Sequence, residues 1–150
     1  NQHVVGDSKY VKVRWPDGRE GLGEVLRVDR RRDVALIRTD ASGRQPLALR
    51  SAEMQVGDTV FAVGTPLQST LQGTVTKGIV SAHRTTDGMS FIQSDVVINS
   101  GNSGGPLLDE KAAVTGIAVS GIELGGAPAG INFFIPIADA LRALNLQPAN

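Results

Sequence analysis

Residues 101–107 have the sequence GNSGGPL, a loop in which Ser103 stands among glycines. Glycine adopts backbone dihedral angles that other residues avoid, and it lets other groups approach the backbone closely. The backbone N–H groups of Gly101 and Ser103 can therefore point at one spot, as the stabilisation of an oxyanion requires. The same residue types are common in turns, so the loop alone could be an ordinary turn. Its interpretation depends on the partners that the rest of the chain offers to Ser103.

A serine hydroxyl is a poor nucleophile until a base takes its proton, and that base works best when a carboxylate orients it. The chain has two histidines, His3 and His83. His83 lies in a polar stretch that ends with Asp87 and Gly88, and this composition predicts a surface loop. His3 is therefore the better candidate for the base, although a histidine at this position could also be a frayed terminal side chain.

Three stretches of the chain resemble the chymotrypsin-like serine proteases, and in particular their bacterial high-temperature-requirement (HtrA, Deg) branch. Loop 101–107 resembles the nucleophile loop, with Asn102 where other branches usually have Asp. Residues 1–5 (NQHVV) resemble the segment that carries the base, and residues 33–37 (DVALI) resemble the segment that carries the acid. Further similar stretches lie at 57–66, 78–82, 92–95 and 130–136, so the resemblance covers nearly the whole chain.

The resemblance implies a catalytic triad of His3, Asp33 and Ser103, in the chain order of the chymotrypsin-like enzymes. Ser103 would attack a peptide carbonyl, His3 would accept and return the proton, and Asp33 would orient His3. The backbone amides of Gly101 and Ser103 would form the oxyanion hole. Taken alone, Asp33 could be a surface acid beside the neighbouring arginines. The assignment therefore depends on the three residues occurring together.

The resemblance also implies a pocket for the substrate side chain, lined by Val97, Ile98, Asn99, Val119, Ser120, Gly121, Asn132, Phe133 and Phe134. No acidic residue is among them, so we expect cleavage after small or medium aliphatic residues and not after Lys or Arg. Related proteases usually have Gly at the position of Asn132 and Ala at the position of Phe134. These two larger side chains would narrow the pocket or change its floor.

Apolar runs of about five to eight residues, separated by turn residues, predict an all-β fold. The alternating residues 10–15 and the Pro16-Asp17-Gly18 turn predict a hairpin with a second strand at 20–29. Further strands are expected at 34–38, 59–64, 71–82, 91–94, 106–108, 114–119 and 132–135. A closing helix is expected from Pro136 to Leu146, where apolar residues recur at helical spacing.

The resemblance implies a trypsin-like double six-stranded β-barrel. It assigns residues 1–45 to the C-terminal part of the first barrel, 46–57 to the connection, 58–136 to the second barrel and 137–150 to the helix and a linker. In the family three more strands precede the histidine segment, so we expect the first barrel to be incomplete. A preceding segment or a partner chain would then have to cover its open edge. Alone, this stretch is expected to be weakly active or inactive. The alternative to a protease is a protease-like binding or regulatory module.

Composition narrows the possible partners. Fifteen basic and 15 acidic residues cancel, so no global field attracts nucleic acid or an anionic membrane. The arginines at 27, 30, 31 and 32 have no interleaved aromatic residues, and we expect them to form a solvated turn. The absence of cysteine excludes disulfides and a thiol nucleophile. No apolar run approaches the roughly 20 residues that span a bilayer.

The remaining expectations follow from the family. The partners are unfolded or misfolded proteins or peptides as substrates, and an oligomer is possible because related proteases are often trimeric. No metal or organic cofactor is implied, since Asp95 and Asp139 are more typical of loop hydrogen bonding than of a metal site. The location is expected to be extracytoplasmic, although no charged-then-apolar leader opens the chain.

Overall fold

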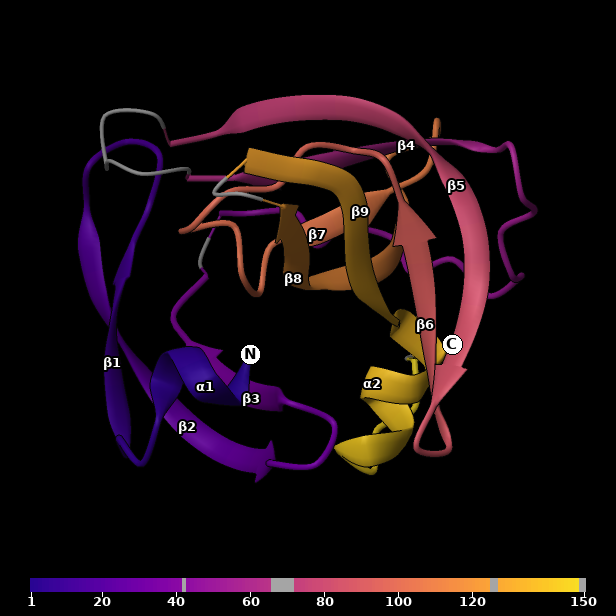
Figure 1. The fold of residues 1–150 in the computed structure, drawn as a ribbon. Helices are drawn as coiled ribbons and strands as arrows, with labels where there is room; N and C mark the ends of the chain where they lie inside the picture. The colour runs from indigo at the N-terminus through magenta and orange to yellow at the C-terminus, as the bar shows by residue number, and fades with distance from the viewer. Residues whose placement is uncertain (42, 66–71, 125–126, 149–150) are drawn as a thin grey trace.

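Strands form two separate units in the computed structural model, which describes residues 1–41, 43–65, 72–124 and 127–148 and only the backbone of 120, 122–124 and 127–128. In chain order the elements are α1 (Gln2–Val5), β1 (Tyr10–Arg14), β2 (Glu20–Asp29), β3 (Val34–Thr39), β4 (Thr59–Gly64), β5 (Thr74–Thr86), β6 (Met89–Ser94), β7 (Pro106–Leu108), β8 (Val114–Leu124), β9 (Ala127–Pro136) and α2 (Ile137–Ala143). The first unit is the antiparallel sheet β1-β2-β3, and the second is a closed barrel in the order β4-β5-β6-β9-β8-β7 (Figure 1). The prediction of an all-β fold with a closing helix is confirmed.

The first sheet is held by the expected hairpin. Val11 and Val13 of β1 are half-buried, whereas the Lys and Arg that alternate with them are exposed. Gly23 of β2 lies beneath them, because a Cβ there would come within 3.0 Å of both valines and 2.7 Å of Ile37. Glycine therefore leaves room for the side chains that the two neighbouring strands place over this position.

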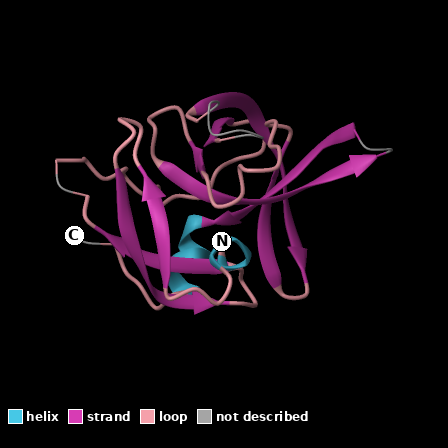
Figure 2. Cartoon of the chain, turned by 90° about the vertical axis from the view of Figure 1, so that its left-hand side faces the viewer, coloured by secondary structure: helices cyan, strands magenta, loops and turns pink. Residues whose placement is uncertain are grey.

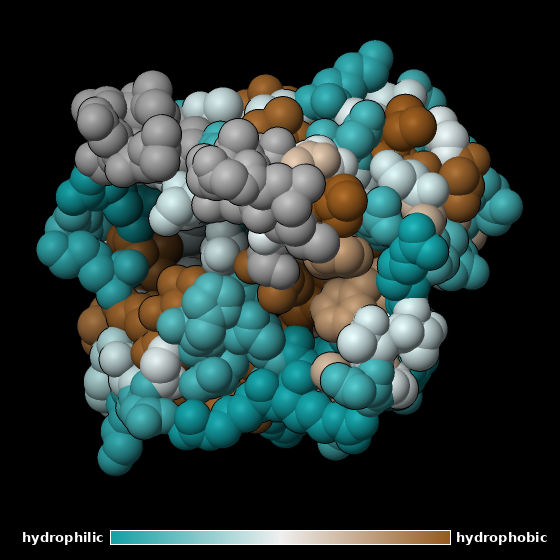
Figure 3. All heavy atoms as spheres, in the orientation of Figure 1, coloured by the Kyte–Doolittle hydropathy of each residue, from teal (hydrophilic) through white to brown (hydrophobic). Residues whose placement is uncertain are grey.

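Part of this sheet is uncovered. β1 and β3 are its edge strands among the described residues. Large apolar side chains are exposed along it, namely Tyr10, Leu22, Leu26, Val28 and Ile37. Hydrophobic spheres also gather at the left of Figure 3, where Figure 1 places β1 and β2. An apolar surface of this kind is typical of a face that another element covers.

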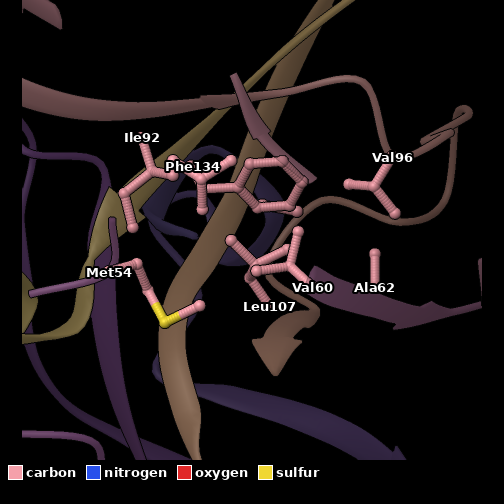
Figure 4. Close-up of a cluster of buried hydrophobic side chains, with 9 residues drawn as sticks. Met54, Val60, Ala62, Ile92, Val96, Leu107 and Phe134 are labelled. Carbon is pink, nitrogen blue, oxygen red and sulfur yellow. The ribbon is translucent and has the colours of Figure 1, made fainter. Parts of the chain in front are cut away.

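The barrel has a closed apolar core. Val60, Val80, Leu107 and Phe134 are fully buried, and other apolar side chains pack around them (Figure 4). Burying each side chain of this size stabilises the fold by about 1.5–3 kcal/mol. The barrel therefore provides a rigid support for the loops that leave it.

The hairpin β5–β6 corrects the expectation for His83. β5 continues to Thr86, and the two-residue turn Asp87-Gly88 has positive φ at both positions (50° and 73°), as a tight hairpin turn of type I′ requires. His83 thus lies inside a strand and not in a surface loop. Its Nε2 lies 2.8 Å from the Met54 carbonyl oxygen. The polar composition concealed a strand that runs up to its turn. Residue 71, expected to open this strand, lies outside the described residues.

The closing helix α2 is shorter than expected. It ends at Ala143, and Asn145 follows with a φ of 53°. The N–H of Asn145 donates to the Arg142 carbonyl and that of Leu146 to the Leu141 carbonyl, at 3.0 and 2.8 Å. These two bonds form a Schellman motif, which ends a helix at a left-handed residue while apolar spacing continues beyond it. None of the helices in the described part of the chain is long and apolar enough to cross a membrane.

The arginine run joins the two units, so the expectation of a solvated turn is wrong for Arg32, whose side chain is 8% exposed. Arg27 donates to the carbonyl oxygen of Leu144 at 2.9 Å, and Arg31 donates to that of Asp87 at 3.1 Å. These two guanidinium groups donate hydrogen bonds to backbone carbonyl oxygens at the end of α2 and at the β5–β6 turn. In Figure 1 the β2–β3 turn accordingly lies beside α2.

Candidate active site

His3 and Asp33 are joined by two hydrogen bonds. The backbone N–H of His3 donates to Oδ1 of Asp33 at 2.8 Å, and Nδ1 of His3 lies 2.6 Å from Oδ2. With Asp33 ionised, the proton of the neutral imidazole belongs on Nδ1, which leaves Nε2 as an acceptor. The His3 side chain is 51% exposed and that of Asp33 22%. The pair therefore presents a basic nitrogen at an accessible surface.

Asp33 has an uncommon backbone conformation. It connects the β2–β3 turn to β3, with a φ of 60°. A non-glycine residue in this region costs of order 1 kcal/mol and persists only where its surroundings hold it. The Asn1 amide Nδ2 donates to the Asp33 carbonyl oxygen at 3.1 Å. Asn1 thus secures the acid from the side of α1.

The loop that carries Ser103 is fastened to the barrel. The N–H of Gly104 donates to the Ala118 carbonyl, and the N–H of Ala118 donates to the Gly105 carbonyl, both at 2.9 Å. The buried Asn102 side chain packs against Gly64, where a Cβ would collide with it. The loop is therefore positioned by close backbone contacts that larger residues would prevent.

The amides expected to form the oxyanion hole are available. The N–H of Asn102 donates to the Asn99 carbonyl at 3.0 Å, and Gly101 has a φ of 98° inside this turn. A turn with positive φ at its third position favours glycine. The N–H groups of Gly101 and Ser103 have no acceptor within the described part of the chain. They are free to bind an oxygen from outside.

The hydroxyl of Ser103 is bonded within its own unit. Its Oγ donates to the Val119 carbonyl at 3.3 Å, and no hydrogen bond joins it to His3 among the described residues. The two groups nevertheless belong to one region, because a Cβ on Gly104 would lie 3.0 Å from the backbone nitrogen of Asn1. In Figure 2 the N-terminus lies near the middle of the molecule, with strands on both sides. The structure thus brings α1 to the serine loop and pairs His3 with Asp33 but not with Ser103.

The residues expected to line the substrate pocket have different environments. Asn132 is 3% exposed, and its Nδ2 donates to the Val96 carbonyl at 2.8 Å. It pairs across the sheet with Gly121, where a Cβ would collide with the Asn132 amide oxygen. The Asn132 side chain therefore fills the space beside Gly121 of β8. Gly121 lies two residues after Val119, whose carbonyl oxygen binds Ser103.

The other expected pocket residues lie on both faces of the barrel wall. Phe134 is fully buried in the core, and Ile98 packs against the same core. Phe133 points to the other face, where its ring lies 6.2 Å from that of Phe91. Val97 is 47% exposed, Asn99 supplies the turn carbonyl, and the Ser120 side chain lies outside the described residues. Their role in a pocket remains a prediction.

Arg32 and Asn1 contact or adjoin this site and were not expected from the sequence. Arg32 gave no separate signal because it is one of several neighbouring arginines. Asn1 was included in the stretch 1–5 that resembles the base segment, but no role was expected for its side chain. Both were recognisable only from contacts distant in the chain.

Residues 1–117 match the trypsin-like peptidase domain, and the chain belongs to this family. It is similar to serine protease HTRA1 of Xenopus laevis, with 38% identity over 161 residues that cover 100% of this chain and 33% of that protein. It is also 39% identical over 150 residues to a probable periplasmic serine endoprotease DegP-like of Pseudomonas putida, covering 97% of this chain and 31% of that protein. The chain thus spans about a third of the length of these relatives.

Solved structures agree with this family. The HtrA-type protease AlgW with decapeptide superimposes with a TM-score of 0.87 at 33% identity, covering 97% of this chain and 46% of that chain. The serine endoprotease from Yersinia pestis has a TM-score of 0.81 at 34% identity, covering 95% and 50%. The resemblance to the HtrA branch is confirmed.

Proposed function

We propose that this chain is the proteolytic unit of an HtrA-type serine endopeptidase that hydrolyses peptide bonds of unfolded or misfolded proteins. The observation that carries the proposal is the His3–Asp33 pair, in which both carboxylate oxygens bind His3, at 2.8 and 2.6 Å. The pair belongs to the same region as a serine loop with two unoccupied amide donors. Serine proteolysis requires this combination of groups.

In the proposed reaction Ser103 first leaves the Val119 carbonyl. This bond is long at 3.3 Å, and breaking a neutral hydrogen bond costs only about 0.5–1.5 kcal/mol. His3 Nε2 then takes the hydroxyl proton while Oγ attacks the peptide carbonyl carbon. The amides of Gly101 and Ser103 stabilise the oxyanion, and His3 returns the proton to the leaving amine. Water hydrolyses the acyl-enzyme by the same route.

The substrate preference proposed for this unit is a small aliphatic side chain. The buried Asn132 amide occupies space beside Gly121 that a Gly at position 132 would leave open. A pocket shortened in this way favours alanine-sized residues over larger ones. The relative AlgW was solved with a decapeptide, which is compatible with a peptide substrate.

The surroundings proposed for the whole protein follow from its relatives. An extracytoplasmic location is proposed because a relative is named periplasmic. The exposed apolar residues of the first sheet, such as Leu22 and Tyr10, support the proposal that another segment or a partner chain covers it. An oligomer is proposed on the family resemblance.

A second candidate is a protease-like binding module. The bond from Ser103 to Val119 instead of His3 favours it, because it leaves the nucleophile without a base in this conformation. Such a module would bind peptides without cleaving them.

A fluorophosphonate probe, which reacts with activated serines, separates the two functions. The protease is expected to be labelled, with labelling lost in Ser103→Ala and slowed by several orders of magnitude in His3→Ala. The matched control is Ser100→Ala, which removes an exposed serine of the same loop and should change nothing. Saturable peptide binding without labelling would favour the binding module and overturn the protease.

A further inference from the structure

Arg32 precedes Asp33 directly and extends into the second unit. Its Nη2 donates to the carbonyl oxygen of Ser90 in β6 and to Oδ2 of Asp139 in α2, the latter at 3.2 Å. Its guanidinium carbon lies 4.7 Å from the centre of the Phe91 ring. A planar cation held by a carbonyl, a carboxylate and an aromatic face has one favourable orientation. The residue before the proposed acid is therefore fixed to the barrel and its helix.

The residue after Asp33 is anchored in the same part of the molecule. Val34 is 1% exposed and packs in a cluster with Ile135, Ala140 and Leu144. Asp33 thus lies between Arg32, which binds β6 and α2, and Val34, which packs in a buried cluster with residues of β9 and α2. This bracketing explains how its φ of 60° is maintained.

Stability alone does not account for Arg32. Its Nε and Nη1 are buried without a hydrogen-bond partner in the described structure. Burial lowers the pKa of the guanidinium, although Asp139 and Asp29 oppose this change. A buried cation with unsatisfied donors costs free energy, and an apolar side chain of similar volume would often fill such a site at lower cost.

We propose that Arg32 is a positioning residue that fixes the β2–β3 turn to β6 and α2 and thereby holds the Asp33 carboxylate against His3. The inference rests on the proposed function, because only a proteolytic role requires an oriented His3. Without Arg32 the turn can shift, the two bonds to His3 loosen, and the imidazole loses its orientation. A misplacement of about 1 Å costs on the order of 100-fold in rate.

The test compares Arg32→Met with a matched control, Arg142→Met. Arg142 binds the same carboxylate, with its Nη1 3.0 Å from Oδ1 of Asp139, but its side chain is 77% exposed. One readout is kcat and KM on a peptide substrate. The other is the low-field proton NMR signal of the His3 Nδ1–H, which reports the bond to Asp33 without requiring activity.

For Arg32→Met we expect kcat about 100-fold lower, KM within about twofold and the low-field signal lost. Arg32→Lys should restore part of both, because a lysine ammonium keeps a cation for Ser90 and Asp139 but has no plane to lie over the Phe91 ring. Arg142→Met should change neither. A folded Arg32→Met with unchanged kcat and an unchanged signal overturns the proposal.

Asp139→Asn is measured in case Arg32→Met does not fold. This substitution weakens one bond to Arg32, so kcat and the low-field signal should fall less than in Arg32→Met. Unchanged values of both would overturn the proposal. If the unaltered protein is not labelled by fluorophosphonate but its low-field signal disappears in Arg32→Met, the positioning role stands and the proteolytic function fails. If the unaltered protein is labelled and Arg32→Met has the same kcat and the same low-field signal, the proteolytic function stands and the positioning role fails.

Discussion

The two units of the molecule differ in how they close. Every barrel strand has two neighbours, and Val60 and Phe134 in the core are fully buried. Within the described residues the first sheet has two edge strands, and its Leu22 and Tyr10 are 64% and 56% exposed. The proposed nucleophile is on the closed unit, whereas the proposed base and acid are on the open one. Contacts of the neighbouring Arg32 and Val34 with the barrel and α2 therefore help to hold the proposed acid in place.

Among the changes that compare the two units, Asp33→Asn is expected to have the largest effect, and it tests whether the first unit holds an orienting acid. The amide can no longer accept at both oxygens, so His3 loses the tautomer that the carboxylate selects. We expect kcat to fall about 10⁴-fold in steady-state assays on a peptide substrate. Asp7→Asn is the control, because Asp7 pairs with exposed Arg30 on the same unit. A fall of less than about tenfold would contradict this role of Asp33.

Phe134→Ala and Leu22→Ala compare the two units in stability. Phe134 is fully buried, so its truncation should lower the free energy of unfolding by about 3–5 kcal/mol. Leu22 is 64% exposed, and its truncation should change that free energy by less than about 0.5 kcal/mol. Denaturant titration measures both. A large loss in Leu22→Ala would mean that the first sheet is covered in solution, for example by a second copy.

The Asp109 carboxylate gives the barrel a stability that depends on pH. Desolvation raises the pKa of its carboxyl, but hydrogen bonds from Arg50, Ala113 and Lys111 outweigh this and lower the pKa below its ordinary value. Because the folded pKa is the lower one, the carboxylate stabilises the fold above the unfolded pKa. This stabilisation is lost as the pH falls through the folded value. Asp109→Asn should lose about 1–3 kcal/mol at neutral pH, with the difference narrowing below about pH 4.

The matched change in the first sheet is Glu20→Gln. A hydrogen bond from Arg14 lowers the pKa of Glu20, but both side chains are well exposed. Solvent screening makes such pairs weak, so thermal unfolding followed against pH should hardly change. A pH dependence equal to that of Asp109→Asn would show that the open unit is as well packed as the barrel.

The last prediction concerns substrate preference, which we assign to the barrel alone. Asn132→Gly removes the buried amide beside Gly121. The ratio of kcat/KM for a valine over an alanine substrate should rise about tenfold. Competition between the two substrates measures this ratio directly. An unchanged ratio would place the specificity elsewhere, for example on the first sheet.

Local patterns predicted most of the strands. The alternation before the Pro16-Asp17-Gly18 turn gave β1, and short apolar runs gave β4 and β7 with their observed bounds. The end of β5 was missed because its residues are polar and its turn occupies only Asp87 and Gly88. The end of α2 was missed because Asn145 stops the helix by its backbone conformation, not by its hydropathy. Hydropathy identifies a buried face, whereas hydrogen bonding at the ends determines length.

The site was predictable to a different extent. Recognition of the serine loop and of the two earlier segments, 1–5 and 33–37, led to His3, Asp33 and Ser103. The structure pairs His3 with Asp33. The bond from Ser103 to Val119 could not be predicted, because it depends on a side-chain rotation that no sequence pattern records. The buried position of Arg32 was equally hidden, since its partners are 58 and 107 residues away in the chain.

The contact between Gly64 and Asn102 has a consequence for evolution. Position 64 can gain a side chain only if position 102 loses volume, because the Asn102 amide occupies the space that a Cβ would need. Among descendants of a common ancestor, the two positions should therefore change together. A lineage that gained a side chain at position 64 alone would displace the serine loop before it altered any residue of the proposed triad.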